Sequence, residues 1–342
     1  MRFAFGNGFS PTKLDEFRAV ARAADDAGFA MTMTGDSPAL GGDHYVGLAM
    51  VALSTTRARI GSYISNPVTR HPVVAAAAIA SVNEIAGGRA FLGLSTGDSG
   101  VYNLGLKPAT QAQLEEYILT IKTLFEKGEA QFQGTTVHFG WSRRAVPIYM
   151  APGGPKGLRL AGRIADGVFL ETGFIPEVIE DTLQQLADAA REAGRSIDDL
   201  DIWWHARASF GKSIDDAIDQ IPSGILGIGN RLARFQKEGK FIPDEIWPRL
   251  QELKRRYDFM GHHERPDQTR PTSNATMLDE LGLREYLSER FAIVGTPEDF
   301  VTRIKRLESL GVRNIAFSGL MSDKLGFIEC VRSAVMPHLS MH

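Results

Sequence analysis

Polar residues that could bind a ligand follow two apolar segments of the chain. Residues 90–94 are mostly apolar and lead directly into residues 95–98, Ser-Thr-Gly-Asp. Residues 147–150 lead into the pair Gly153-Gly154, after which a helical segment begins. Adjacent glycines let backbone amides approach an anion closely, and a helix N-terminus adds partial positive charge. Two such strand ends, one barrel position apart, predict a phosphate-binding site; the alternative is that Gly153-Gly154 is only a tight turn.

A carboxylate and an imidazole on one loop form a second candidate. Asp36 ends the strand-like segment 31–36, and His44 follows after a glycine-containing stretch. Such a pair can hold a water molecule or a substrate proton, because imidazole titrates near neutral pH. We predict that both residues act on the substrate or the cofactor during turnover. The alternative is that Asp36 caps the next turn and that His44 is a solvated loop residue.

Two adjacent histidines, His262 and His263, lie in a charged segment with Asp258 and Glu264. Adjacent histidines point in different directions and no third ligand follows at helical spacing, so we predict no metal site. We predict instead that His262 contacts the substrate from a lid; a solvated loop is the alternative.

The neighbouring residues of two further histidines bear on their roles. His71 precedes a proline at the start of a helical segment, which favours a structural role there. His205 lies in a strand-like segment, and the alternation of side chains leaves open whether it faces the barrel interior.

Strand-like and helix-like segments alternate along the chain and would position these residues. Eight alternations predict an α/β protein with a (β/α)8 TIM barrel rather than an open doubly wound sheet. A small hairpin is predicted within residues 132–139. We expect a single domain over residues 1–342, with residues 223–290 as an insertion between strands 7 and 8 that covers the catalytic face as a lid. The predicted strands are 2–8, 31–36, 59–65, 90–96, 147–150, 168–170, 202–210 and 312–317.

The composition of the chain argues against several classes of protein and site. The 342 residues carry 38 basic and 41 acidic side chains, a net charge of −3, which does not favour a nucleic-acid partner. The single cysteine, Cys330, excludes an internal disulfide and a cysteine-rich zinc site. The chain contains no apolar run of about 18 residues, so we predict no membrane span. The first predicted strand begins where a signal peptide would lie, so we expect no signal peptide. We therefore expect a cytoplasmic protein with no nucleic-acid or membrane partner.

Three segments together resemble the bacterial luciferase-like flavin monooxygenases and their deazaflavin-dependent relatives. They are residues 66–72 (Asn-Pro-Val-Thr-Arg-His-Pro), residues 87–98 from Gly-Gly-Arg to Ser-Thr-Gly-Asp, and residues 153–168 from Gly-Gly-Pro-Lys to Ala-Asp-Gly-Val. The resemblance covers nearly the whole chain. It implies a flavin-binding TIM-barrel enzyme and, as in many relatives, a homodimer or higher homo-oligomer formed through helices beside the early strands.

The resemblance also implies cofactor-binding residues. Ser65 and Asn66 match the end of the third strand, where the family often has a non-proline cis peptide that faces the isoalloxazine ring. Asp36 matches the end of the second strand, which faces the reacting ring. Cofactor contacts are also implied for Thr96, Gly97, Asp98, Gly153, Gly154, Glu171 and Thr172.

The activity expected first from the resemblance is that of a two-component monooxygenase. Reduced FMN from a separate flavin reductase would react with O2 to oxygenate a small organic substrate. No Gly-x-Gly-x-x-Gly nicotinamide fingerprint follows the first strand, in agreement with a flavin that is reduced elsewhere. The alternative is a dehydrogenase or reductase that uses the deazaflavin coenzyme F-420 and transfers a hydride without activating O2. A second alternative is a non-catalytic flavin-binding barrel.

Overall fold

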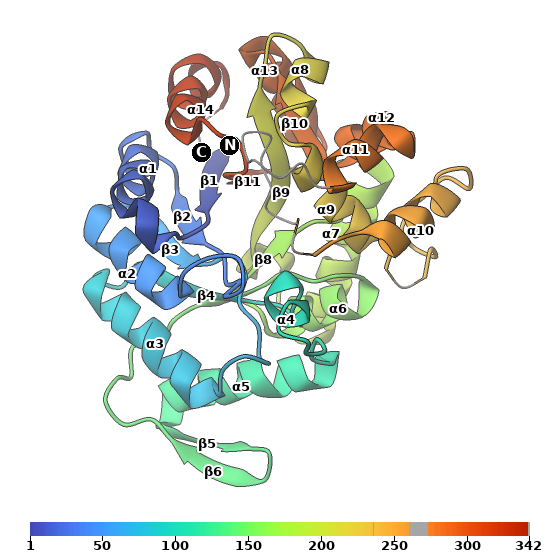
Figure 1. Ribbon diagram of the computed structural model, residues 1–342. Helices are drawn as coiled ribbons and strands as arrows, with labels where there is room; N and C mark the ends of the chain where they lie inside the picture. The colour runs from blue at the N-terminus through green and yellow to red at the C-terminus, as the bar shows by residue number, and fades with distance from the viewer. Residues whose placement is uncertain (235, 260, 262–272, 341–342) are drawn as a thin grey trace. The chain divides into compact units, whose positions relative to one another are not determined.

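The computed structural model describes residues 1–340 except 235, 260 and 262–272 (Figure 1). It divides into two compact units. The N-terminal unit comprises Ala4–Phe169 with Leu186–Asp201, and the C-terminal unit comprises Met1–Phe3, Leu170–Gln185 and Ile202–His342.

The N-terminal unit contains six neighbouring parallel strands with helices between them. The strand residues are almost all buried, as expected where helices cover a parallel sheet. In Figure 1, helices α1 to α3 lie along one side of strands β1 to β4. The strands are β1 (Arg2–Asn7), β2 (Met31–Thr34), β3 (Arg59–Ser62), β4 (Ala90–Leu94), β7 (Ile148–Met150) and β8 (Gly167–Leu170). The helices are α1 (Leu14–Asp26), α2 (His44–Ser54), α3 (Pro72–Ile85), α4 (Ser99–Tyr102), α5 (Gln111–Lys127) and α6 (Pro155–Ile164).

Local sequence signals explain where several of these helices begin. Asp43 caps α2, and a reciprocal capping box of Thr110 and Gln113 opens α5. The His71 ring Nδ1 accepts a hydrogen bond from the Val73 amide at the start of α3, which confirms the structural role predicted for this histidine. The predicted hairpin is also confirmed: β5 (Glu129–Phe132) pairs with β6 (Thr135–His138) and extends beyond α5 in Figure 1.

Strand register brings the first strand ends level with one another. Asn7 of β1 pairs with Thr34 of β2, and Thr34 pairs in turn with Ser62 of β3. Beyond β3 the chain stays beside its neighbour, because Ser65 forms an isolated parallel bridge with Leu94 of β4. The segments that follow β2, β3 and β4 therefore leave the sheet at one edge.

The C-terminal unit contains three parallel strands in the order β10, β9, β11. They are β9 (Asp201–Phe210), β10 (Ala292–Gly295) and β11 (Asn314–Ser318). Strand β10 is absent from the prediction: its four residues directly continue a helical segment and are too few to show a period of two. The helices are α7 (Pro176–Glu192), α8 (Ile214–Ile218), α9 (Pro222–Leu232), α10 (Trp247–Arg256), α11 (Ser273–Glu280), α12 (Arg284–Phe291), α13 (Pro297–Ser309) and α14 (Lys324–Cys330).

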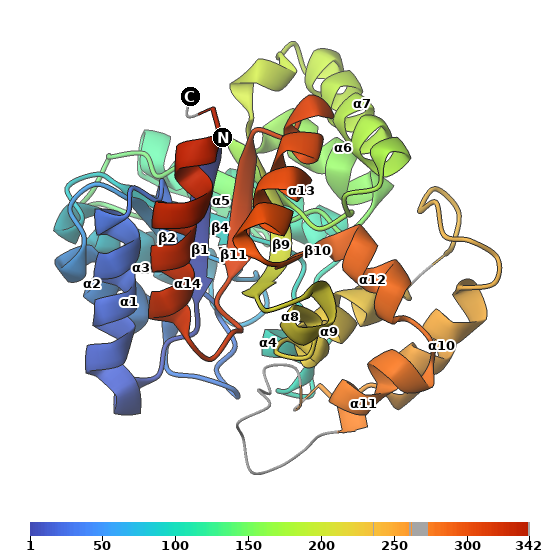
Figure 2. The ribbon, with the colours of Figure 1, turned by 90° about the horizontal axis from the view of Figure 1, so that it is seen from above.

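Helices occupy the predicted insertion, residues 223–290. Helix α9 is buried along most of its length and contacts α10, α11 and α12, which gather around it in Figure 2. This part of the chain lies between β9 and β11, the seventh and eighth of the predicted strands. Its role as a lid stays a prediction.

The strands and their order confirm the predicted fold class, a (β/α)8 TIM barrel with an insertion between strands 7 and 8. The eight predicted strands correspond to β1, β2, β3, β4, β7, β8, β9 and β11. Neighbouring strands pair in parallel from β1 through β4 and β7 to β8, and β9 pairs in parallel with β11. Strand β10 adds a ninth strand beside β9. Within the described part of the chain, none of the helices combines the length and the apolar character that crossing a membrane requires.

Candidate active site

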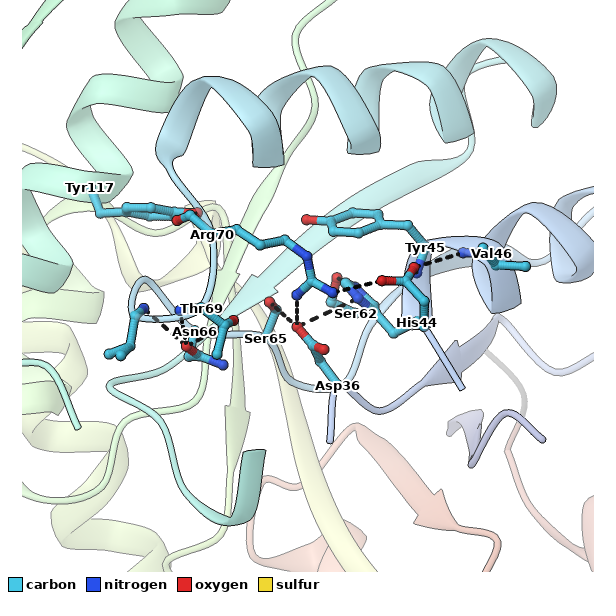
Figure 3. A network of polar contacts seen from close by, with 12 residues as sticks. Asp36, His44, Tyr45, Val46, Ser62, Ser65, Asn66, Thr69, Arg70 and Tyr117 are labelled. Atoms are coloured by element: carbon cyan, nitrogen blue, oxygen red, sulfur yellow. Dashed lines mark hydrogen bonds and ion pairs between the residues drawn. The ribbon is translucent and has the colours of Figure 1, made fainter. Parts of the chain in front are cut away.

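A buried carboxylate, Asp36, is the centre of a polar network in the N-terminal unit (Figure 3). Its Oδ2 accepts hydrogen bonds from Ser65 Oγ at 2.6 Å and from Arg70 Nη1 at 2.5 Å. The ring Nδ1 of His44 lies 3.5 Å from the same oxygen. The Asp36 side chain is only 2% exposed. The structure thus brings two predicted site residues, Asp36 and Ser65, into direct contact.

A tight turn after β3 returns Arg70 to this carboxylate. Asn66 Oδ1 accepts hydrogen bonds from the amides of Val68 at 2.9 Å and Thr69 at 3.1 Å, and from the Thr69 hydroxyl at 3.2 Å. Such a turn, formed by an asparagine side chain, reverses the chain locally. The hydroxyl of Tyr117 on α5 donates a hydrogen bond to the Arg70 carbonyl at 3.1 Å. The side chain of Asn66 therefore shapes the loop that carries Arg70.

The cis peptide lies earlier than the resemblance implies. It joins Tyr63 and Ile64 rather than residues at Ser65 and Asn66. The difference follows from the strand boundary, because β3 ends at Ser62 and not at residue 65.

The guanidinium of Arg70 also holds the start of α2. Its Nη2 donates to Asp43 Oδ2 at 2.9 Å, while Asp43 Oδ1 accepts from the amides of Tyr45 at 2.9 Å and Val46 at 3.2 Å. The guanidinium carbon lies 5.1 Å from the centre of the Tyr45 ring, a distance typical of a cation–π contact. One arginine therefore links the ends of β2 and β3 to the N-terminus of α2.

His44 is not the solvated loop residue of the alternative interpretation. It is the first residue of α2, its side chain is 0% exposed, and its Nε2 lies 2.9 Å from Ser62 Oγ. Burial lowers the pKa of His44 to about 4, although the nearby Asp36 carboxylate opposes this shift. The imidazole is therefore neutral at physiological pH. Its catalytic role stays a prediction.

Burial of His44 predicts a loss of stability in acid. The unfolded chain protonates this imidazole near its ordinary pKa of 6.5, whereas the folded chain does so only near 4. Between these values the unfolded state binds more protons, so the free energy of unfolding falls as the pH falls. We expect the contribution of His44 to this loss to be about 2 kcal/mol at about pH 4.5. Urea unfolding at about pH 7 and about pH 4.5 measures it. His44→Asn should lose less stability between these pH values, and an unchanged loss would contradict the prediction.

Residues after β4 lie against the same network. The hydroxyls of Ser37 and Ser99 lie 3.0 Å apart. Gly100 packs so closely that a Cβ there would come within 2.4 Å of the Asp36 carbonyl oxygen. A Cβ at Gly97 would lie 3.5 Å from the Asn66 Cβ. Three of the strand ends that carry predicted site residues, those after β2, β3 and β4, therefore meet in the N-terminal unit.

The predicted phosphate-binding turn follows β7, which pairs with β4. Gly153 and Gly154 precede α6, whose N-terminus has no side-chain cap. A Cβ at either glycine would meet no atom within 4 Å, so the space around the turn is open. Uncapped backbone amides beside open space suit an anionic group such as a cofactor phosphate. These features fit the prediction, and cofactor binding here stays a prediction.

The C-terminal unit holds a charged cluster around Glu171. Its Oε1 accepts a hydrogen bond from Arg231 Nη2 at 3.0 Å and also contacts His205 Nδ1. Its Oε2 forms an ion pair with Arg231 Nε at 2.9 Å. Although burial opposes it, the Arg231 guanidinium holds the pKa of Glu171 below its ordinary value. Burial lowers the pKa of His205 to about 4. Both carboxylate oxygens of Glu171 thus have protein partners.

Thr172, another residue predicted to contact the cofactor, has hydrogen-bond partners within the protein. Thr172 contacts Thr182 through its hydroxyl at 3.1 Å, and its carbonyl accepts from Arg290 Nη2 at 3.0 Å. The predicted substrate contact His262 lies outside the described residues. Sequence reasoning did not assign roles to Arg70 or Arg231, and the only available signal was the place of Arg70 within residues 66–72. Among the described residues, no group of three or more histidine, cysteine, aspartate or glutamate side chains is arranged to hold a metal ion.

Comparison with known proteins finds relatives along nearly the whole chain. The 5,10-methylenetetrahydromethanopterin reductase of Methanopyrus kandleri is 28% identical over 96% of this chain and 95% of that protein. The F420-dependent glucose-6-phosphate dehydrogenase of Microbacterium testaceum is 27% identical over 85% of this chain and 81% of that protein. The solved structure of the coenzyme F420-dependent tetrahydromethanopterin reductase from Methanopyrus kandleri has the same fold, with a TM-score of 0.75 and 24% identity over 99% of this chain and 100% of that one.

These relatives correct the expected activity. The expectation of an FMN-dependent monooxygenase that uses O2 is wrong, because the similar proteins are reductases and dehydrogenases, and the names of two of the three include F420 as the coenzyme. They support the deazaflavin alternative, and the expected flavin reductase partner is not supported. The chain is an oxidoreductase. The model of the luciferase-like monooxygenase family matches residues 3–314, which confirms the resemblance and establishes that the chain belongs to this family.

Proposed function

We propose that this protein is a deazaflavin-dependent dehydrogenase or reductase that transfers a hydride between coenzyme F420 and a small organic substrate. The observation that carries the proposal is the similarity to a reductase over 96% of the chain and to an F420-dependent dehydrogenase over 85% of it. A bound deazaflavin would supply the hydride donor or acceptor. The residues of the chain would bind it, orient the substrate and transfer the accompanying proton.

The N-terminal unit offers groups for each part of such a cofactor. The open amides at Gly153-Gly154 would hold its phosphate, since a helix N-terminus attracts anions. Thr96, Gly97 and Asp98, together with Ser65 and Asn66, would border the ring system at the ends of β4 and β3. This assignment is supported by the short distance between Gly97 and Asn66 and by the bridge between Ser65 and Leu94.

Asp36 is our candidate for the proton transfer. When a substrate loses a hydride from carbon, a proton must also leave its hydroxyl or amino group, and a carboxylate can accept it. In the reductive direction the same carboxyl group would return that proton. His44 would support Asp36 from its buried position at 3.5 Å.

The cofactor assignment is tested by binding measurements. We expect the purified protein to bind F420 and to bind FMN at least about tenfold more weakly. We also expect Gly153→Val to weaken F420 binding by at least about tenfold, because the valine side chain would occupy the open space beside the helix N-terminus. Fluorescence titration with each cofactor gives the dissociation constants.

A matched glycine serves as the control for this measurement. Gly140 also has no atom within 4 Å of a built Cβ but lies in the loop after β6. Gly140→Val should bind F420 like the unchanged protein. Tighter binding of FMN would contradict the proposed cofactor, and binding of neither cofactor would favour a non-catalytic barrel.

We also propose that the protein forms a homodimer through α2 and α3. The two helices contact each other and expose apolar side chains, among them Leu53 at 65% and Val74 at 56%. Helix α2 contains no lysine, arginine, aspartate or glutamate, so its exposed face offers no charge to select a different partner. Light scattering should give twice the mass of the chain, and the double variant Leu53→Glu with Val74→Glu should give the monomer mass. A monomer before any substitution would contradict the proposal.

A further inference from the structure

One oxygen of the Asp36 carboxylate takes all the contacts that the structure gives this side chain. Ser65 Oγ, Arg70 Nη1 and His44 Nδ1 all approach Oδ2. Within the described residues, no hydrogen bond or ion pair reaches Oδ1. Each carboxylate oxygen has lone pairs for about two hydrogen bonds, so the accepting capacity of Oδ2 is used and that of Oδ1 remains.

The guanidinium that contacts Oδ2 is itself held from several sides. Its second nitrogen, Nη2, donates to Asp43, and its central carbon lies over the Tyr45 ring. Its backbone is held by the Tyr117 hydroxyl and by the Asn66 turn. The two terminal nitrogens of the planar guanidinium contact the carboxylates of Asp36 and Asp43 at the same time. A lysine ammonium at this position has one nitrogen and could not make both contacts.

Charge balance in the network depends on this arginine. Burial opposes it, but Asp36 and Asp43 raise the pKa of Arg70 above its ordinary value, so the guanidinium stays charged. The charged and titratable groups that face it are Asp36, Asp43, Tyr45 and Tyr117, and His44 faces Asp36 as a neutral ring. Without Arg70, two carboxylates would share the network with no cation between them.

We propose that Arg70 is a positioning residue: it fixes Asp36 through Oδ2 and thereby presents Oδ1 as the single oxygen that exchanges a proton with the bound substrate. The inference rests on the proposed function of Asp36. It implies that the substrate carries an O–H or N–H group at the point that meets Oδ1, because a carboxylate oxygen accepts hydrogen bonds. The proton moves between that group and Oδ1, while Oδ2 keeps its contacts with Ser65 and Arg70.

The test compares Arg70→Ala, Arg70→Lys and a control arginine. We expect Arg70→Ala to lower kcat by about a hundredfold and to leave F420 affinity within about threefold, because Asp36 loses its orientation but the cofactor contacts remain. Guanidinium ion added to the assay should raise the kcat of Arg70→Ala by at least about tenfold. Arg70→Lys should stay impaired. Arg163→Ala, which removes an ion pair between the exposed Arg163 on α6 and the half-buried Glu115 on α5, is the control and should keep full activity.

A second readout does not depend on turnover. In the protein without cofactor, infrared spectroscopy can record the carboxylate stretching bands of Asp36 as the difference between each protein and its Asp36→Asn form. We expect these bands to shift in Arg70→Ala, because the guanidinium no longer donates a hydrogen bond to Oδ2. Arg70→Ala with unchanged kcat, no rescue by guanidinium, or unshifted Asp36 bands would each overturn the inference. Failure of the unchanged protein to bind F420 would instead overturn the proposed function.

Discussion

Asp36→Asn is expected to lower kcat by at least about a hundredfold while F420 affinity changes by less than about threefold. Asparagine has nearly the same shape, and its amide oxygen can take the place of Oδ2 toward Ser65 and Arg70. Its NH2 group then stands where Oδ1 was and cannot accept a proton. The substitution therefore removes the proton acceptor and keeps the network. Steady-state kinetics with F420 and binding titrations measure the two effects separately.

Another buried aspartate provides the control. Asp25, at the end of α1, accepts hydrogen bonds from the amides of Thr56, Arg57 and Ala58 and is also almost fully buried. Asp25→Asn should lower the free energy of unfolding, since charged acceptors of backbone N–H groups stabilise folds, but the folded molecules should turn over normally. Near-normal turnover in Asp36→Asn would remove Asp36 from the chemistry.

Gly93→Ala is expected to lower the free energy of unfolding by about 3 kcal/mol. A Cβ at this position in β4 would lie 2.1 Å from the Ser62 carbonyl oxygen and 3.0 Å from the Ile64 side chain. The first contact is with backbone, so it can be relieved only by moving β3 and β4 apart. Because Ser62 also contacts His44, we expect the network around Asp36 to be disturbed as well.

Chemical denaturation at neutral pH measures this loss. Gly140→Ala adds the same methyl group where no atom lies within 4 Å and should change stability by no more than about 0.5 kcal/mol. Equal stability of the two variants would show that β3 and β4 separate more easily than this packing indicates.

Most of the fold was predictable from the sequence because parallel strands in such a barrel are short, buried and separated by helices of regular period. The boundary errors are small: β3 ends at Ser62 instead of residue 65, which also moves the cis peptide to Tyr63 and Ile64. Strand β10 escaped prediction because Ala292–Gly295 follows α12 without a turn. Local patterns carry little information on such a junction.

The candidate site was predictable in part, for a different reason. Asp36, Asn66 and Gly97 follow strand ends. Parallel topology brings the carboxyl ends of the strands to one edge of the sheet independently of the side chains they carry. The contact between Arg70 and Asp36 joins residues 34 positions apart and depends on the turn that Asn66 forms, which no periodicity reveals. Asp43 is an N-cap residue type, and it could have indicated that His44 begins a helix rather than lying in a loop. Burial of His44 depends on its contact with Ser62, which the local sequence does not reveal. None of the sequence motifs that we could interpret distinguishes an FMN site from a deazaflavin site.

Burial of the ion pair between Asp36 and Arg70 determines how strongly the pair responds to ionic strength. The two side chains are 2% and 17% exposed, so counterions in solution can hardly approach them. At about 0.15 M salt the Debye length is about 8 Å, and charges at the surface are screened while buried pairs are screened much less. The pair between Arg163 and Glu115, with side chains 44% and 30% exposed, weakens as salt is added. Orientation of the Asp36 carboxylate is therefore insulated from changes in the salt concentration around the protein.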